Sequence, residues 1–311
     1  MRTCSAVLFA FITLVSTTAA PRPSPIWPPT GQVRMIIDTD TANEIDDQYA
    51  IALALGFPEK IRIEGFVAAH FGDAGGSTGI DKSFAEIEAT LSKARMAGKF
   101  PVKRGLDPLQ YRDRIPTSDG VEFIIEKAKQ STPQDPLWLV LLGPATDAAA
   151  ALIKEPSIAD RMIVFWHGRT QWPLRAWNFN AYNDIRAARL LFELPCRFIL
   201  FDTGTYLRIP MEETKERYAG LGPLGAYLYE IRLRKPAWQQ PSKGVFDLGD
   251  IAAFVDPSTV RWEKVEAPFL DQDLRYDFNR KQGEIIRIYH VESEPTFALL
   301  EKALRTLRSS R

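Results

Sequence analysis

The chain has 311 residues, and its 39 lysine and arginine residues are balanced by 39 aspartate and glutamate residues. This balance lacks the basic excess of a nucleic-acid-binding protein, so we expect no nucleic-acid partner. The hydrophobic content of 45% is ordinary for a globular chain, and the length is compatible with one large α/β domain or with two.

Residues 1–20 have the pattern of a secretory signal peptide. A short positive region precedes an apolar run, and small residues up to Ala20 suit a cleavage site. The apolar run is too short to span a bilayer comfortably, although an uncleaved anchor is the alternative. We therefore expect a secreted or periplasmic protein, with a proline-rich linker over residues 21–31 and one domain over residues 32–311.

An acidic segment follows the first predicted strand. The strand ends in the apolar run Met35–Ile37, and a helical pattern covers Glu44–Leu55. Between Asp38 and Asp47 lie four aspartates and one glutamate, whose mutual repulsion requires a cation or a proton to relieve it. The segment favours a hard divalent cation held by oxygen ligands. A solvated acidic turn with an aspartate helix cap is the alternative.

Strands and helices alternate along the rest of the chain, which predicts an α/β fold with an open, mainly parallel sheet and helices on both faces. Right-handed crossovers would bring the turns after Ile37, Ala69, Leu142 and Trp166 to one edge of this sheet, where they could form one site. Strands are predicted at 61–69, around 101–102, at 137–142, 162–166 and 197–201, and as a pair within 264–291. Helices are predicted at 80–97, 121–129, 145–152, 183–193, 211–234, 250–255 and 294–308.

The acidic segment resembles the opening of the inosine- and uridine-preferring nucleoside hydrolases, calcium-dependent N-ribohydrolases whose chains begin with Asp-x-Asp and a following Asp-Asp. Here the two pairs are Asp38-Thr39-Asp40 and Asp46-Asp47, which are two residues further apart than in the best-known members. Three later segments are similar to those of the family and occur in the same order: Leu141–Asp147, Trp177–Asn180, and Asp247 ahead of Asp256-Pro257.

This resemblance implies an enzyme that cleaves the N-glycosidic bond of a ribonucleoside to ribose and free base with a Ca²⁺-bound water. It implies that Asp40, Asp47 and Asp247 ligate the Ca²⁺ together with the backbone carbonyl of Leu142. Asp40 would also act as the general base, and Asp38 would brace the loop. Helix capping is the alternative role for Asp247. The family often forms dimers or tetramers, so the resemblance also implies a homo-oligomer.

The resemblance assigns the substrate contacts as well. Asp46 and Asn180 would hydrogen-bond the ribose hydroxyls, and Trp177 offers an aromatic face that suits a flat base. Asn178 stands where the family usually has a glutamate near the 5′ end of the sugar. Its amide can still hydrogen-bond a hydroxyl, but it brings no charge. A turn residue is the alternative for Asn180, and core packing is the alternative for Trp177.

The leaving-group side departs from the family. Phe246 precedes the metal aspartate at a position where purine-cleaving members often carry a histidine acid, and a phenyl ring cannot donate a proton. His70, in a glycine-bearing loop after a strand, is the first predicted catalytic acid, and His167 is the second. A structural role is the alternative for each of these histidines.

Two other functions remain open at this point. The departures at Asn178 and Phe246 are consistent with an exported calcium- and ribose-binding protein that has lost turnover. The run Asp38–Thr41 after an apolar strand also resembles the opening of haloacid dehalogenase-type phosphatases, in which Asp38 would be the nucleophile and magnesium the metal. The second acidic pair follows too soon for that family, which makes a phosphatase the weaker alternative.

Overall fold

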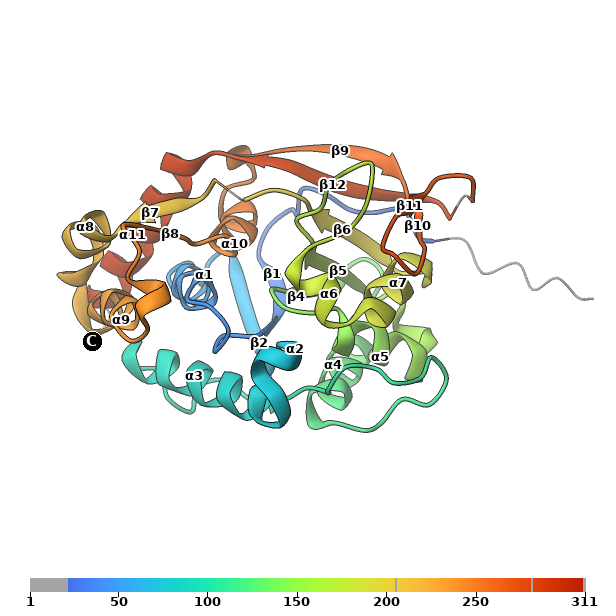
Figure 1. Ribbon diagram of the computed structural model, residues 1–311, viewed down its shortest axis with the longest axis horizontal. Coiled ribbons are helices and arrows are strands. Elements are labelled where there is room, and N and C mark those ends of the chain that lie inside the picture. The colour runs from blue at the N-terminus through green and yellow to red at the C-terminus, as the bar shows by residue number, and fades with distance from the viewer. Residues whose placement is uncertain (1–21, 205, 281, 310–311) are drawn as a thin grey trace, which may run out of the picture.

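The structure is a computed structural model that describes residues 22–309 apart from positions 205 and 281. It contains an eight-stranded sheet whose neighbours are all parallel except for the last pair, β12 and β9 (Figure 1). The predicted open, mainly parallel sheet is therefore confirmed. In spatial order the strands are β3 (Val102–Arg104), β2 (Ile61–Ala68), β1 (Val33–Thr39), β4 (Leu137–Leu141), β5 (Met162–His167), β6 (Arg197–Phe201), β12 (Glu284–Val291) and β9 (Val260–Glu266).

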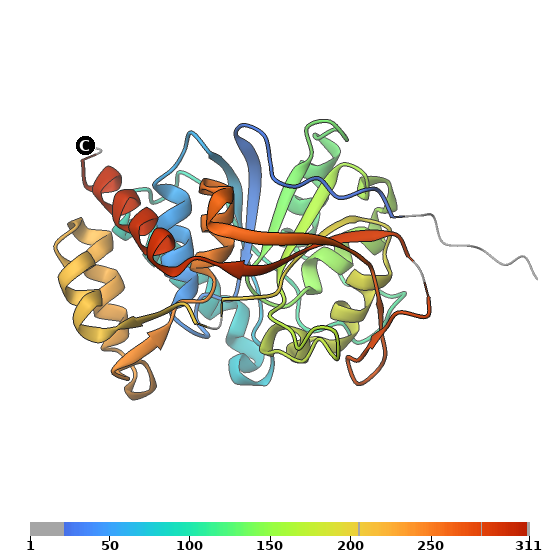
Figure 2. The same cartoon turned by 90° about the horizontal axis from the view of Figure 1, so that it is seen from above.

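Helices cover both faces of the sheet, as predicted, and each face has its own apolar core (Figures 1 and 2). Alternate residues of β4 point to opposite faces, so Trp138 joins one core and Leu139 joins the other. The first core includes α1 (Asp46–Leu55), α3 (Gly79–Lys93), α9 (Gly222–Arg232), α10 (Leu248–Val255) and α11 (Ser293–Ser309). The second includes α4 (Asp119–Lys129), α5 (Thr146–Lys154) and α7 (Ile185–Glu193).

Several short elements differ from the sequence predictions. The helix predicted over residues 211–234 is divided into α8 (Met211–Thr214), a π-helical turn (Lys215–Ala219) and α9. Gly222 has a positive φ of 87°, which interrupts the helix ahead of α9. The sequence analysis also missed α6 (Phe179–Asn183). The other elements are α2 (Gly72–Gly75) and the two-stranded pairs β7 (Arg208–Pro210) with β8 (Ser242–Gly244) and β10 (Phe269–Leu270) with β11 (Tyr276–Asp277). Short 3₁₀ helices occur at Gly76–Thr78, Pro156–Ile158, Pro236–Trp238 and Pro257–Thr259.

The segment ahead of the sheet packs against the domain. Residues 22–32 contain no helix or strand, yet Trp27 is buried, with its ring centroid 5.7 Å from that of Phe165 and 5.6 Å from that of Phe254. Figure 2 shows this segment in blue, passing β4 and β5 before it enters β1. The predicted signal peptide lies outside the described residues. Within them, no helix is both long and apolar enough to cross a membrane.

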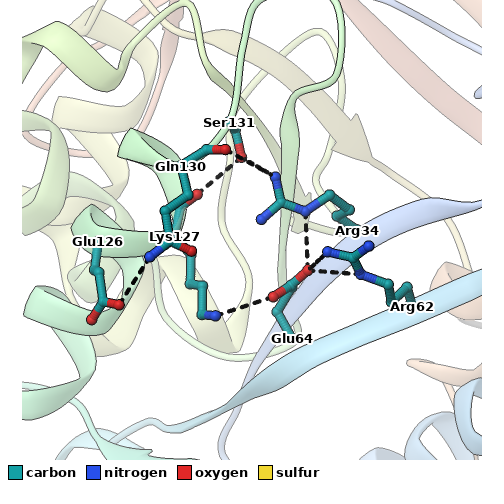
Figure 3. Close-up of polar contacts among 7 residues, drawn as sticks. All are labelled: Arg34, Arg62, Glu64, Glu126, Lys127, Gln130 and Ser131. Atoms are coloured by element: carbon teal, nitrogen blue, oxygen red, sulfur yellow. Dashed lines mark hydrogen bonds and ion pairs between the residues drawn. The ribbon is translucent and has the colours of Figure 1, made fainter.

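A cluster of charges joins β1, β2 and α4 in the half of the sheet where β1 begins (Figure 3). Glu64 accepts hydrogen bonds from Arg34 at 3.0 Å and Arg62 at 2.7 Å, and it lies 3.2 Å from the ammonium of Lys127. Burial alone would raise the pKa of the Glu64 carboxyl, but these three cations outweigh burial and lower the pKa to about 2. The cluster therefore stabilises the sheet without contributing to its opposite, carboxyl edge.

Candidate functional site

A pocket of about 200 Å³ lies at the carboxyl edge of the sheet, between the turns that follow β1, β4 and β5. The chain leaves β1 toward β2 on one side, whereas β4 is followed by β5 on the other, so the strand order reverses at this point. Open α/β sheets bind ligands at such a reversal. Most of the predicted site residues line the pocket: Asp40, Asp46, Asp47, Leu142, Asn178, Asn180 and Asp247.

Two predicted residues, His70 and Trp177, are not among the described residues that line this pocket. The buried His70 accepts a hydrogen bond from the Gly72 amide at Nδ1, and its Nε2 lies 2.7 Å from the hydroxyl of Thr146. Burial lowers the pKa of His70 to about 4. Trp177 is 44% exposed, and its ring packs against Tyr182. Both side chains thus make contacts elsewhere in the fold.

Three carboxylates converge in the pocket. Asp46 and Asp47 are the first two residues of α1, and Asp247 directly precedes α10. One oxygen of each lies within 4.8 Å of an oxygen of the other two. Burial, followed by the neighbouring carboxylates, raises the pKa of Asp47 and Asp247 well above the usual aspartate value. The three side chains are thus a strained group of like charges, and a cation would relieve the strain.

The structure gives these carboxylates few other partners. Asp247 occupies the N-cap position of α10, yet its side chain makes no capping hydrogen bond, which argues against the alternative role in capping. The Oδ2 atom of Asp40 is buried and has no hydrogen-bond partner among the described residues. Asp47 accepts a hydrogen bond from Thr39. The clustered carboxylates, with the unpaired oxygen of Asp40 beside them, fit a hard divalent cation, which takes oxygen ligands.

Asp38, expected to brace the loop, makes no side-chain hydrogen bond. Both of its carboxylate oxygens are buried without a partner among the described residues. Burial, together with the charges of Asp147 and Asp40, raises the pKa of Asp38 well above its usual value. The contact that fixes the turn is instead made by the backbone, where the Asp38 carbonyl accepts a hydrogen bond from the Leu142 amide at 2.8 Å.

Asn180 connects the ends of β4 and β5. Its Nδ2 donates hydrogen bonds to the carbonyl oxygens of Leu142 at 2.8 Å and His167 at 3.0 Å. Both amide hydrogens are therefore used, and Oδ1 is left to accept a hydrogen bond from a ligand hydroxyl. The Leu142 carbonyl keeps a second lone pair beyond the one that Asn180 occupies, so it can still contribute to a cation site.

His167 and Asp250 form a pair that the sequence analysis did not recognise as a unit. The Nδ1 of His167 lies 2.6 Å from Asp250 and 3.5 Å from Asp247. Burial raises the pKa of Asp250 to about 6, although the charge of His167 acts in the opposite direction. Asp250 follows Asp247 by three residues on α10, a spacing that places side chains on one helix face and that could have suggested the pair. His167 lines the pocket, and Asp250 fixes the orientation of its ring.

Two residues between the aspartate pairs of the acidic motif also contribute to the site. Asn43 and Glu44 line the pocket, and the carboxylate of Glu44 lies 2.5 Å from the ammonium of Lys243 on β8. Next to them, Asp46 accepts a hydrogen bond from the backbone amide of Phe246 at 3.2 Å. Glu44 thus forms an ion pair that joins the acidic segment to the two-stranded β7–β8 sheet.

Comparisons with known proteins agree with this geometry. Residues 35–285 match the family model of the inosine-uridine preferring nucleoside hydrolases. A plant nucleoside hydrolase has the same fold, with 19% identity, a TM-score of 0.71, and coverage of 88% of this chain and 99% of that chain. A purine-preferring ribonucleoside hydrolase from Gardnerella vaginalis has 20% identity, a TM-score of 0.69, and coverage of 89% and 100%.

No curated protein matches the chain, and the identities to the solved structures are low enough that these likenesses show the fold alone. The family match, in contrast, extends over most of the described residues and includes the acidic segment, the ends of β4 and β5, and Asp247. The chain therefore belongs to the inosine-uridine preferring nucleoside hydrolase family, enzymes that hydrolyse the N-glycosidic bonds of nucleosides.

Proposed function

We propose that this protein cleaves the N-glycosidic bond of a ribonucleoside to ribose and free base, with Ca²⁺ held in the carboxylate cluster. The observation that carries the proposal is the convergence of Asp46, Asp47 and Asp247 within 4.8 Å of one another at the reversal in strand order. Membership of the family supports a nucleoside as the substrate. The choice of Ca²⁺ follows from the oxygen-only donor set and from the resemblance in sequence.

Asp47 and Asp247 of this cluster would hold the cation, together with the Leu142 carbonyl and with Asp40, which lines the same pocket but is not one of the three clustered carboxylates. When bound, calcium would supply a positive charge that orients a water and the sugar hydroxyls and favours deprotonation of that water. Asp40 is suited to accept the proton because its Oδ2 has no partner among the described residues. Asp46 would accept a hydrogen bond from a ribose hydroxyl. The group of carboxylates would also stabilise the positive charge that develops on the sugar as the base departs.

The leaving base requires a proton or another form of activation. Of the two predicted histidines, His167 is the one that lines the pocket, and Asp250 orients its ring at 2.6 Å. We therefore place His167 ahead of His70 as the proton donor to the leaving base. Phe246 also lines the pocket but cannot transfer a proton.

The test is release of reducing sugar from inosine and uridine by the chelator-treated protein, with and without added calcium. We expect release that depends on calcium and is lost in Asp40→Asn. Asp113→Asn serves as the control because Asp113 is exposed and lies outside the pocket. If neither nucleoside is cleaved while calorimetry shows that ribose binds, hydrolysis is contradicted and the binding-protein alternative is favoured.

Two further features remain predictions. The N-terminal pattern supports export to the periplasm or the medium with cleavage after Ala20, which N-terminal sequencing of the protein from those fractions would test. The family resemblance supports a homo-oligomer, which sedimentation equilibrium of the purified protein would test. A mature chain that still begins at Met1, or a purely monomeric protein, would contradict the respective prediction.

A further inference from the structure

The charges that line the pocket are unevenly distributed. The carboxylates of Asp40, Asp46, Asp47 and Asp247 occupy the part formed by the first strand turn and the starts of α1 and α10. The loop after β5 contributes Arg169, which is the only lysine or arginine among the described residues that line the pocket. A ligand that complements this pocket therefore needs an electropositive or metal-coordinating end and an anionic end.

The guanidinium of Arg169 has no anionic partner within the protein. It stacks over the ring of Phe246 at 4.6 Å from the centroid, and it forms no ion pair or hydrogen bond with any residue in the part of the chain that the structure describes. Stacking uses the face of the guanidinium and leaves the N–H donors at its edge free. A partly buried arginine in a pocket normally pairs with an acid, so these free donors indicate a site for an anion from outside.

The backbone around Arg169 is held firmly on both sides. Asn178 donates from Nδ2 to the Gly168 carbonyl at 3.0 Å, and the Thr170 hydroxyl donates to Asp202 at 2.7 Å. Asp202 in turn pairs with Arg287 at 2.6 Å. The loop is therefore fixed before any ligand arrives, and Arg169 binds a ligand at a lower entropic cost than a side chain on a mobile loop would.

Asn178 is another polar side chain that lines the pocket, and its hydrogen-bonding groups are already used. Besides the bond to Gly168, Nδ2 lies 3.2 Å from the Ala176 carbonyl, and Oδ1 accepts a hydrogen bond from the Ala181 amide at 2.9 Å. A carboxylate at this position would neutralise Arg169 or repel an anion. The neutral amide does neither, so the positive charge of Arg169 remains available.

We propose that Arg169 binds an anionic group carried by the ribosyl substrate, so that this enzyme prefers ribosides with a phosphate on the sugar or a carboxylate on the base over neutral nucleosides. The inference rests on the proposed function for the identity of the substrate as a riboside. The carboxylates, with the cation they would hold, would bind the hydroxyl face of the sugar, and Arg169 would bind the anionic end. The carboxylates and the guanidinium of Arg169 carry opposite charges at separate places in the pocket, and together they set the orientation of the substrate.

Binding is measured first, because it does not require turnover. Calorimetry in the presence of calcium compares ribose with ribose 5-phosphate for the wild type, Arg169→Gln, Arg169→Lys and Arg175→Gln. We expect ribose 5-phosphate to bind at least about tenfold more tightly than ribose, Arg169→Gln to remove this preference, and Arg169→Lys to retain part of it. Arg175→Gln is the matched control, because Arg175 is an exposed arginine of the same loop that stacks on Trp177 outside the pocket.

Sugar release from uridine, uridine 5′-monophosphate and orotidine then identifies which part of the substrate carries the anion. We expect Arg169→Gln to lower kcat/KM about 10- to 100-fold for one anionic riboside and less than threefold for uridine. An equal loss for all three substrates would indicate a structural role and overturn the proposal. If neither ribose 5-phosphate nor orotidine binds more tightly than its neutral counterpart, the proposal fails, even if uridine is hydrolysed. If ribose 5-phosphate is preferred but no riboside is cleaved, the proposed function fails and the anion site stands.

Discussion

Replacing Asp47 with asparagine should stabilise the calcium-free protein and abolish its stabilisation by calcium. Oxygens of Asp46, Asp47 and Asp247 lie within 4.8 Å of one another, and two full charges at that distance repel by about 3.5 kcal/mol at an effective dielectric constant of about 20. Burial and the neighbouring carboxylates raise the pKa of Asp47 and of Asp247, so a proton bound to either carboxylate would relieve part of this repulsion. We therefore expect a gain of about 1–3 kcal/mol. Asparagine also retains an oxygen that can accept the hydrogen bond from Thr39.

The assay is thermal unfolding followed by circular dichroism at pH 7.5, in chelator and again in excess calcium. For a chain of this size a gain of 1–3 kcal/mol corresponds to a rise in Tm of about 2–10 °C. The wild type should gain stability on calcium addition, whereas Asp47→Asn should start higher and gain little. Asp113→Asn, at an exposed position, should behave like the wild type. A lower Tm of Asp47→Asn in chelator, together with an undiminished response to calcium, would refute the reasoning.

Three further predictions concern the surroundings of the site and the charge cluster at the opposite end of the sheet. In Gly143→Ala the added Cβ would lie 3.3 Å from Cβ and Cγ of Asp40, so we expect sugar release to fall about tenfold while Tm changes by less than about 2 °C. Burial raises the pKa of the Asp147 carboxyl to about 7, from an ordinary value of 3.8. Its contribution to the stability of the folded protein is therefore complete below the pKa of the unfolded chain and is lost as pH rises through 7. In urea unfolding, the decrease in stability between pH 4 and 8 should therefore be smaller in Asp147→Asn than in the wild type, by up to about 4 kcal/mol. The pKa of Glu64 is lowered to about 2, so the contribution of Glu64 to folding stability is present above about pH 4.5 and is lost as pH falls toward 2. Glu64→Gln should therefore lower the free energy of unfolding by about 1–3 kcal/mol at pH 7 and by little at pH 2. An equal loss of stability at both pH values would count against the ion pairs.

The sequence was sufficient to predict the features that depend on local pattern. The apolar run of β4 identified a central strand, and β4 indeed lies between β1 and β5. Parallel connection of the strands then placed the turns after β1, β4 and β5 at one edge, which is where Asp40, Leu142 and His167 line the pocket. These predictions succeeded because strand order and crossover handedness are narrowly restricted.

The features that the sequence left open depend on contacts between distant residues. His167 and Asp250 are separated by 83 positions, so no local pattern could show that one orients the other. His70 was the first choice as acid because it follows a strand, but its burial against Thr146 could be seen only in the structure. Arg169 gave no signal of its own, because the absence of an ion-pair partner is a property of its surroundings.

The packing of Trp27 sets a lower limit on how far the chain can be shortened. Its ring contacts Phe254 of α10, the helix that begins beside Asp247, and Arg22 donates a hydrogen bond to the Cys196 carbonyl at 2.7 Å. Removing a buried tryptophan costs about 3–5 kcal/mol. The predicted cleavage after Ala20 would spare both residues, so the mature chain would be nearly the shortest that keeps the packing of Trp27 against α10 and the hydrogen bond of Arg22.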